Sequence, residues 1–175
     1  MLLANTGVSY DFILGNLPRT KYDVFVDAST TWGIGGCCGN KFFKYSWAEI
    51  PHLGTECIAR KELFAALVAL RCFSSIIADR LVVLYTDNSN VSDWLATGRS
   101  PKLKGLKFLA IWEITKFSLR CKVSPRWLPG SHNTSADKLS RGCTPSWLHR
   151  DGIQTFCNME TLAISWKHVE ESWAI

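Results

Sequence analysis

The sequence lacks the features that mark membrane-spanning, secreted and disulfide-stabilised proteins. None of its apolar runs approaches the length of a membrane span, and no basic segment followed by an apolar core indicates a secretory leader. Its seven cysteines include no Cys-x-x-Cys pair, and their odd number argues against a disulfide framework or a zinc cage. We therefore expect an intracellular protein of a reducing compartment, nuclear or cytoplasmic, with no membrane partner.

Internal repeats, low-complexity tracts and a Tyr-x-Asp-Asp polymerase box are also absent. The 175 residues, 47% of them hydrophobic and 20% charged, are expected to form one globular domain. We expect this domain to span residues 21–142, after an N-terminal extension or linker over residues 1–20. Residues 143–175 are amphipathic and contain Trp, which predicts a C-terminal extension that packs on the domain or binds a partner.

Positive charge is concentrated in one part of the chain. Residues 99–126 carry eight Lys and Arg side chains against a single acid, whereas the net charge of the whole chain is +5. Such a basic surface suits a phosphate-rich partner, and Lys102, Lys104 and Lys107 are the candidate contacts. The same charges would equally suit the wet face of an amphipathic helix, which the pattern predicts over residues 103–119. Its core candidates are Leu106, Leu109, Ile111 and Ile114.

Five segments have the composition of β-strands. Residues 22–29 are β-rich, and a Gly-rich segment over 32–39 and a loosely alternating one over 41–47 follow, which predicts an antiparallel meander. The glycines of the second segment permit close approach of another backbone. Residues 81–88 form a short continuous apolar run, typical of a strand covered on both faces, and residues 121–128 form the last strand. The sequence therefore predicts an α/β fold around a five-stranded sheet.

A helix predicted over residues 59–73 carries one carboxylate in an otherwise apolar stretch. Leu63, Leu67 and Leu70 fall on one face at helical spacing. Glu62 lies one turn from the start, at the edge of the face predicted to be buried. A charge there costs free energy unless something compensates it, which favours a functional role. Alternatively, Glu62 is a solvated residue that interacts with the positive end of the helix dipole.

Three further carboxylates have comparable positions. Asp27 ends the first strand, Asp87 ends the fourth, and Asp137 lies in a short helix predicted over residues 134–141. Because the carboxyl ends of strands in an α/β sheet meet in one crevice, we expect these acids and Glu62 to converge there. Four such acids repel one another unless a cation neutralises them, and oxygen-only ligands suit Mg²⁺ or Mn²⁺. Two such ions about 3.5–4 Å apart are a common device for in-line attack at phosphorus.

The motifs around these acids resemble those of the ribonuclease H domain, most closely the domain in reverse transcriptases of gypsy-like and DIRS-like retroelements. The residues that carry the resemblance are Phe25-Val-Asp-Ala-Ser29 with Gly33-Ile-Gly-Gly36, Arg60-Lys-Glu-Leu-Phe-Ala-Ala-Leu-Val-Ala-Leu70, Tyr85-Thr-Asp-Asn88, and Trp127-Leu-Pro-Gly-Ser-His-Asn-Thr-Ser-Ala-Asp-Lys-Leu-Ser-Arg141. These motifs follow one another in the family's order and cover roughly residues 21–142. The resemblance implies a domain of a retroelement reverse transcriptase or a domesticated descendant of one.

This resemblance also implies a fold and an activity. The fold would be ribonuclease H-like, with strands 1–3 antiparallel, strands 4 and 5 parallel, and helices flanking the sheet. The activity would be an endonuclease that cleaves the RNA strand of RNA–DNA hybrids with two Mg²⁺ or Mn²⁺ ions and leaves 5′-phosphate ends. Asp27 would bridge both ions, Glu62 and Asp87 would hold the ion that activates water, and Asp137 would hold the ion at the leaving oxygen. Other domains of a reverse transcriptase, or a host protein, would be partners through the C-terminal extension.

Three more residues are candidates for roles near this site. His132 lies close to the place of a loop His in many cellular members, where it would assist product release, or it is a solvated loop residue. Ser29 and Asn88 are candidate contacts to the hybrid, whose strands differ in the 2′-hydroxyl.

Two alternative functions stay open at this point. One is a catalytically inactive module of the same fold that binds nucleic acid or protein, and the other is a nuclease of the same superfold, such as an integrase or a Holliday-junction resolvase. The motif from Trp127 to Arg141 favours ribonuclease H over both.

Overall fold

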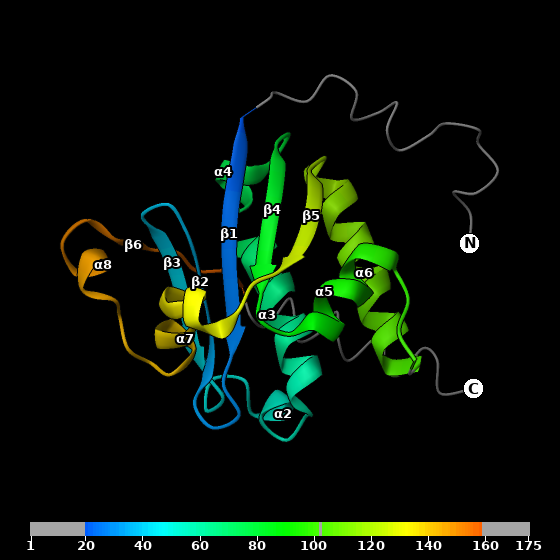
Figure 1. The fold of residues 1–175 in the computed structure, drawn as a ribbon, viewed down its shortest axis with the longest axis horizontal. Helices are drawn as coiled ribbons and strands as arrows, with labels where there is room; N and C mark the ends of the chain where they lie inside the picture. The colour runs from blue at the N-terminus through cyan, green and yellow to red at the C-terminus, as the bar shows by residue number, and fades with distance from the viewer. Residues whose placement is uncertain (1–19, 102, 159–175) are drawn as a thin grey trace.

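The fold is built on one mixed β-sheet, which Figure 1 shows in ribbon form. The structure is a computed structural model and describes residues 20–101 and 103–158. Six strands lie in the order β5-β4-β1-β2-β3-β6. Their bounds are β1 Lys21–Ala28, β2 Gly33–Cys38, β3 Lys41–Ser46, β4 Leu81–Thr86, β5 Lys122–Trp127 and β6 Ile153–Gln154.

The strand directions agree with the predicted mixed sheet, but the predicted number of strands is wrong. Strand β2 pairs antiparallel with β1 and β3, while β4 pairs parallel with β1, and β5 with β4. This confirms an α/β fold with three antiparallel strands followed by two parallel ones. The sixth strand, β6, pairs parallel with β3 through only Ile153 and Gln154. A strand of two exposed residues has no hydrophobic periodicity, so the sequence pattern gave no sign of it.

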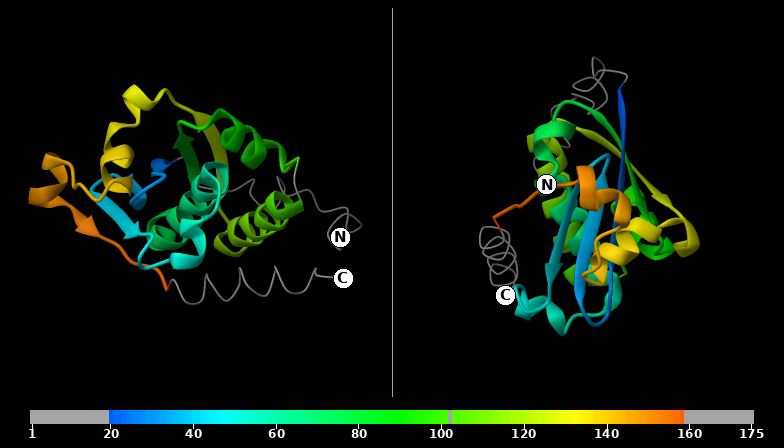
Figure 2. Two further views of the ribbon diagram at one scale, coloured as in Figure 1. Left: turned by 90° about the horizontal axis from the view of Figure 1, so that it is seen from below. Right: turned by 90° about the vertical axis from the view of Figure 1, so that its left-hand side faces the viewer.

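Helices lie on both faces of the sheet, with α3 and α6 on one face and α7 on the other (Figures 1 and 2). The helical segments are α2 Pro51–Gly54, α3 Ile58–Cys72, α4 Ser74–Ile77, α5 Ser89–Thr97, α6 Leu103–Leu119, the 3₁₀ turn η1 Gly130–His132, α7 Thr134–Ser140 and α8 Ser146–Asp151. No helix in the described ranges combines the length and the apolar character that crossing a membrane requires.

Helix α3 forms the centre of the core. Leu63, Phe64, Leu67 and Leu70 are at most 2% exposed, and they share one apolar cluster with Val26 of β1. Full burial of a large apolar side chain contributes about 1.5–3 kcal/mol, so these contacts fix α3 firmly against the strands. The predicted helix is confirmed, and it holds Glu62 next to the carboxyl end of β1.

Helix α6 is apolar on two opposite sides, which makes part of its predicted core wrong. Leu109 and Ile111 are buried as predicted, together with Trp112. Leu106 and Ile114 are instead 43% and 67% exposed. Because apolar residues occur nearly all round this helix, their spacing alone did not distinguish the side that faces the sheet.

Strand β2 allows α7 to lie unusually close to the sheet. A Cβ atom on Gly35 would overlap the side chain of Leu139 and the backbone nitrogen of Ser140 in α7. The predicted close backbone approach at the Gly-rich segment is therefore confirmed. This contact brings Asp137, on α7, beside the end of β1.

Candidate metal centre

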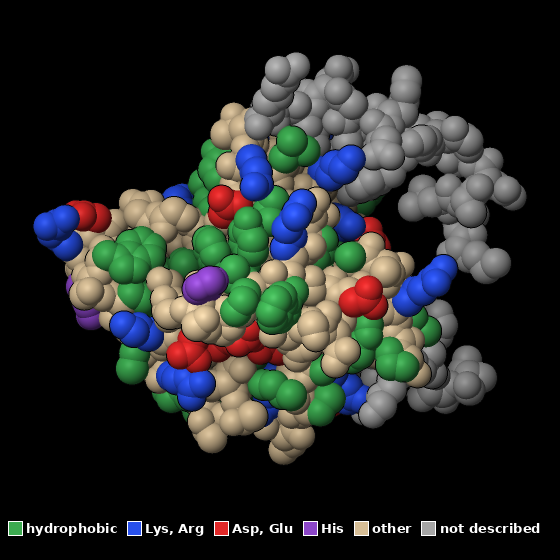
Figure 3. Space-filling model, viewed as in Figure 1, with side chains coloured by type: hydrophobic (Ala, Val, Ile, Leu, Met, Phe, Trp, Pro, Cys, Tyr) green, Lys and Arg blue, Asp and Glu red, His purple; other side chains and the backbone are tan. Residues whose placement is uncertain are grey.

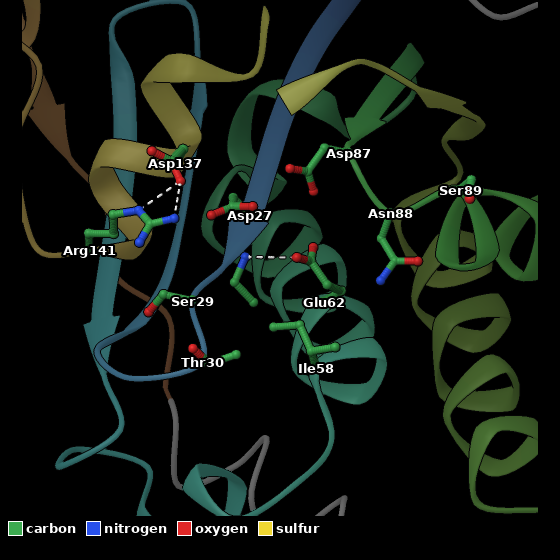
Figure 4. Close-up of a pocket in the computed structure, with 11 residues that line it drawn as sticks. Asp27, Ser29, Thr30, Ile58, Glu62, Asp87, Asn88, Ser89, Asp137 and Arg141 are labelled. Carbon is green, nitrogen blue, oxygen red and sulfur yellow. Dashed lines mark hydrogen bonds and ion pairs between the residues drawn. The ribbon is translucent and has the colours of Figure 1, made fainter. Parts of the chain in front are cut away.

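Three carboxylates meet at the carboxyl ends of β1 and β4, as Figure 4 shows. One oxygen atom each of Asp27, Glu62 and Asp87 lies within 4.8 Å of the other two. Asp27 and Glu62 are 5% and 3% exposed, and Asp87 is half-buried. Asp137 of α7 and Arg141, directly after that helix, line the same pocket, which has a volume of about 430 Å³. The four acids singled out in the sequence thus share one pocket, and three of them form a tight group.

Asp27 is held by helix α7. Its Oδ2 atom accepts a hydrogen bond from the buried hydroxyl group of Ser140. The start of α7 is fixed to the same strand by Asn133, whose side-chain nitrogen donates to the carbonyl oxygen of Val26 at 2.9 Å. These two contacts give the Asp27 carboxylate a defined orientation before any ligand binds.

Glu62 links α3 to the ends of two strands. The backbone N–H of Ala28 donates to its Oε1 at 3.3 Å, and the Thr86 hydroxyl donates to its Oε2 at 3.4 Å. Both distances are long for hydrogen bonds, so these contacts orient the carboxylate but compensate its charge only weakly. The alternative of a solvated helix-start glutamate is wrong, because Glu62 is buried in the second turn of α3.

The other two acids are held more loosely. Trp127 Nε1 donates to the backbone oxygen of Asp87 at 2.9 Å, which fixes the turn after β4. The Oδ1 atom of Asp137 accepts hydrogen bonds from Nε and Nη2 of Arg141, both at 2.8 Å. Both bonds go to Oδ1, and no hydrogen bond to the Oδ2 atom of Asp137 is found in the described part of the chain.

The carboxylates of the group destabilise one another in their ionised forms. Burial raises the pKa of Asp27 to about 6, and Asp87 and Asp137 add to this rise, while the Ser140 hydrogen bond opposes it. Burial, with the nearby Asp27 and Asp87, raises the pKa of Glu62 well above its ordinary value. Burial and the charge of Asp137 likewise raise the pKa of Asp87. The group therefore has more negative charge than its surroundings compensate, which a bound cation would correct.

The donor set fits a hard divalent cation. The three clustered side chains offer only carboxylate oxygens, which Mg²⁺ and Mn²⁺ prefer over nitrogen or sulfur. In an octahedral Mg²⁺ site with bonds of about 2.0–2.1 Å, neighbouring oxygen atoms lie about 2.9 Å apart and opposite ones about 4.2 Å apart. The group, whose oxygen atoms lie within 4.8 Å of one another, would therefore close in around a bound ion. Asp27, Glu62 and Asp87 could therefore hold one such ion together.

Ser29 and Asn88, the candidate contacts to nucleic acid, line this pocket but also have structural tasks. The buried Ser29 hydroxyl donates to the Ser140 oxygen at 2.9 Å and accepts from the backbone N–H groups of Trp32 and Gly33. The Asn88 Oδ1 atom accepts from the backbone N–H of Val91 and caps α5. Both side chains therefore position the rim of the pocket, and their contact with nucleic acid stays a prediction.

The remaining candidates are His132 and three lysines of the basic stretch. His132, in η1, lines a neighbouring apolar cavity rather than the acidic pocket. Lys102 and the side chain of Lys104 lie outside the described residues, and Lys107 is half-buried on α6, away from the residues that line the pocket. A catalytic role for His132 and phosphate contacts by these lysines stay predictions.

Two side chains at the acidic group, Ser140 of α7 and Arg141 directly after it, were not predicted from the sequence. Ser140 and Arg141 lie three and four residues after Asp137, so one face of the helix carries all three. That spacing was visible in the sequence. The signal was overlooked because Ser and Arg near a helix end usually act as solvated or capping residues.

Divalent cations are expected to stabilise the protein more near pH 7.5 than near pH 5. Below a pKa of about 6, Asp27 holds a proton that an ion must displace, and the raised pKa values of Glu62 and Asp87 act in the same direction. In the metal-free protein, ionisation of Asp27 lowers the free energy of unfolding as the pH rises from 3.8, its ordinary pKa, to about 6. Addition of Mg²⁺ or Mn²⁺ should raise the melting temperature by about 5 °C near pH 7.5 and by much less near pH 5. Equal shifts at both pH values would contradict cation binding by these acids.

Comparison of the chain with protein-family models, with curated proteins and with solved structures gave no match.

Proposed function

We propose that the chain is a metal-dependent endonuclease that cleaves the RNA strand of RNA–DNA hybrids. The observation that supports this most is the tight group of Asp27, Glu62 and Asp87 in an open pocket that Asp137 also lines. The motif resemblance described above supplies the substrate class and a retroelement origin, with the rest of a reverse transcriptase or a host protein as partners.

The chain's own residues account for binding and orientation in this proposal. Two Mg²⁺ or Mn²⁺ ions, when bound, supply an activated water and neutralise charge at the leaving oxygen. Asp27 interacts electrostatically with both Asp87 and Asp137, which suits the ligand shared by two ions. Glu62 and Asp87 lie on one side of it, and Asp137 lies on the helix that packs on its other side. The contacts from Ser140 and Ala28 orient the carboxylates of Asp27 and Glu62 toward the pocket before ions bind.

Arg141 would bind the phosphate of the substrate in this arrangement. Its guanidinium lies at the pocket and is largely exposed, although two of its nitrogens already contact Asp137. A planar guanidinium has five N–H donors, and those of Arg141 that no described residue engages can meet phosphate oxygens. The positive charge of Arg141 also partly offsets the negative charges of Asp27 and Asp87. This offset weakens the repulsion of an anionic substrate from the pocket.

Selection of the hybrid would depend on the small polar side chains at the rim. Thr30, Asn88 and Ser89 line the pocket beside the acids, whereas the Ser29 hydroxyl at the same rim is already engaged by neighbouring backbone groups. Hydroxyl and amide groups of this kind can recognise a 2′-hydroxyl, which only the RNA strand carries. Ile58 also lines the pocket and would contribute an apolar contact to the sugar edge.

The test of this function is cleavage of an end-labelled RNA–DNA hybrid with Mg²⁺ or Mn²⁺, beside RNA–RNA and DNA–DNA duplexes. We expect cleavage of the RNA strand of the hybrid alone, with 5′-phosphate products. The Asp87→Asn variant should lose it, because it removes a charged ligand. Asp93→Asn is the matched control, since Asp93 is an exposed carboxylate of the adjacent helix α5 and does not line the pocket.

Two results would contradict the proposal. If the protein binds the hybrid but does not cleave it with either Mg²⁺ or Mn²⁺, the alternative of a catalytically inactive module of this fold is favoured. Cleavage that Asp87→Asn retains in full would place the activity outside the acidic pocket.

A further inference from the structure

The face of the sheet that carries α7 is covered only in part. Helix α7 packs on β1, β2 and β3, whereas α5 packs on β4 and β5 with its apolar residues in the core around α3. Within the described ranges, no helix packs on β4 and β5 from the α7 side, as Figures 1 and 2 show. The open part of this face therefore lies beside the acidic pocket and is available to a ligand.

Two aromatic rings and a cation form a row across this open face. Phe25 of β1 pairs with Tyr85 of β4, which in turn pairs with Arg126 of β5. Residues directly opposite one another on neighbouring strands point to the same face. That face is the open one, because Phe25 packs on the small apolar cluster around Leu139 of α7. The rings of Phe25 and Tyr85 are stacked, with centroids 4.9 Å apart and planes 13° from parallel.

The surroundings of this row are chemically mixed. Both rings are half-buried and Arg126 is exposed. Lys122, also exposed, lies four residues before Arg126, an even separation that puts both on the same face of β5. Figure 3 shows apolar side chains gathered beside the acidic group on this face of the molecule, with Lys and Arg side chains beyond them. The row is thus apolar at its two stacked rings and carries positive charge at one edge.

A cavity of about 390 Å³ continues the row at its other end. Phe25, His132, Asn133 and Trp147 line it, and the indole ring of Trp147 is half exposed. Asn133 is 1% exposed, and its buried Oδ1 atom has no hydrogen-bond partner in the described part of the chain. Cavities of this size, lined by aromatic groups with a few polar ones, suit small planar organic ligands. An N–H donor that reaches Asn133 would satisfy its unpaired oxygen.

We propose that this row and cavity form a platform on which unpaired nucleobases of the bound strand stack. Phe25 and Tyr85 lie two residues before Asp27 and Asp87 on the same strands, which places the platform about 7 Å from the acidic pocket. Aromatic rings stack on any base, and Arg126 and Lys122 lie where the phosphates of such a strand would pass. The choice of nucleic acid as the ligand rests on the proposed function, whereas the platform itself rests on the geometry of this face.

The proposal is tested by binding of labelled RNA in EDTA, where no metal-dependent cleavage occurs. The probes are a single-stranded RNA, a blunt RNA–DNA hybrid, and the same hybrid with a single-stranded RNA extension at either end. We expect the wild-type protein to bind the extended hybrid about tenfold more tightly than the blunt one, because each stacked base adds affinity. Tyr85→Leu and Arg126→Gln should each reduce this ratio, and the double variant should bring it close to one. Tyr85→Phe should keep it, because the ring is retained.

The control variants change side chains that lie outside the row. Phe156→Leu and Arg150→Gln change an exposed ring and an exposed cation outside the row and should leave the ratio unchanged. Arg126 is exposed on the edge strand β5, so Arg126→Gln is expected to fold. This variant therefore tests the platform even if Tyr85→Leu does not fold. Three results would overturn the platform. The wild-type protein could bind the extended and blunt hybrids equally well, or the double variant could keep the preference for the extended hybrid. The third is a protein dimer that the Tyr85→Leu substitution dissociates. Binding of single-stranded RNA needs neither metal nor cleavage. The binding assay therefore tests the platform separately from the proposed activity.

Discussion

Replacement of Asp27 by Asn is expected to abolish cleavage and, at the same time, to stabilise the metal-free protein near pH 7.5. Asp27 is buried, its pKa is raised to about 6, and the charges of Asp87 and Asp137 add to that rise. One pKa unit corresponds to about 1.4 kcal/mol, so removal of the charge should stabilise the fold by about 1–3 kcal/mol. Asn keeps a side-chain oxygen that can accept the Ser140 hydrogen bond. Cleavage should fall by about 1,000-fold or more, because the ligand proposed to bridge both ions loses its charge.

The two effects of Asp27→Asn are separable by chemical denaturation in EDTA and by the hybrid cleavage assay. The stability gain should shrink as pH falls through about 6, because the wild-type carboxyl then becomes neutral too. Asp93→Asn should show neither effect, since Asp93 is exposed. A variant with lower stability than the wild type near pH 7.5 in EDTA would contradict the repulsion inferred within the acidic group.

Replacement of Gly35 by Ala is expected to destabilise the protein by about 3 kcal/mol. The added methyl group would overlap Leu139 and the backbone of Ser140, and backbone atoms of a packed helix cannot rotate away as a side chain can. Helix α7 would be pushed off β2, and with it both Asp137 and the hydroxyl group that holds Asp27. Cleavage should therefore fall even at temperatures where the variant stays folded.

The control for this variant is Gly54→Ala, in α2. A Cβ atom there would meet the Trp47 side chain no closer than 3.4 Å, which is ordinary van der Waals contact. This variant should change the free energy of unfolding by less than about 1 kcal/mol. Urea denaturation of both variants measures the difference, and equal stabilities would show that α7 does not depend on the close approach at Gly35.

The parts of the molecule that the sequence predicted correctly are encoded by short-range patterns. Helix α3 has apolar residues at helical spacing, and the strands that end at Asp27 and Asp87 are brief β-rich runs before polar turns. Glu62 was conspicuous because it is the one acid within an apolar helix. The convergence of these acids then followed from a general property of parallel strands, which align their carboxyl ends.

The parts that the sequence did not predict depend on contacts between distant residues. Strand β6 exists because Ile153 and Gln154 pair with β3, more than a hundred residues earlier, and not because of their own composition. Helix α6 is apolar on both sides, so its own sequence does not determine which side is buried. Packing of the side that carries Trp112 against other elements determines it. The stacked pair of Phe25 and Tyr85 likewise follows from strand register, which no local pattern specifies.

Binding of Mn²⁺ to the isolated protein tests most directly whether Asp27, Glu62 and Asp87 form a metal centre. Titration calorimetry near pH 7.5 should give saturable binding that releases protons and that Mg²⁺ displaces. Affinity should fall at least about tenfold in Glu62→Gln and remain unchanged in Asp93→Asn. Absence of Mn²⁺ binding to the wild type, or binding that Glu62→Gln leaves intact, would contradict the metal centre and the nuclease mechanism built on it.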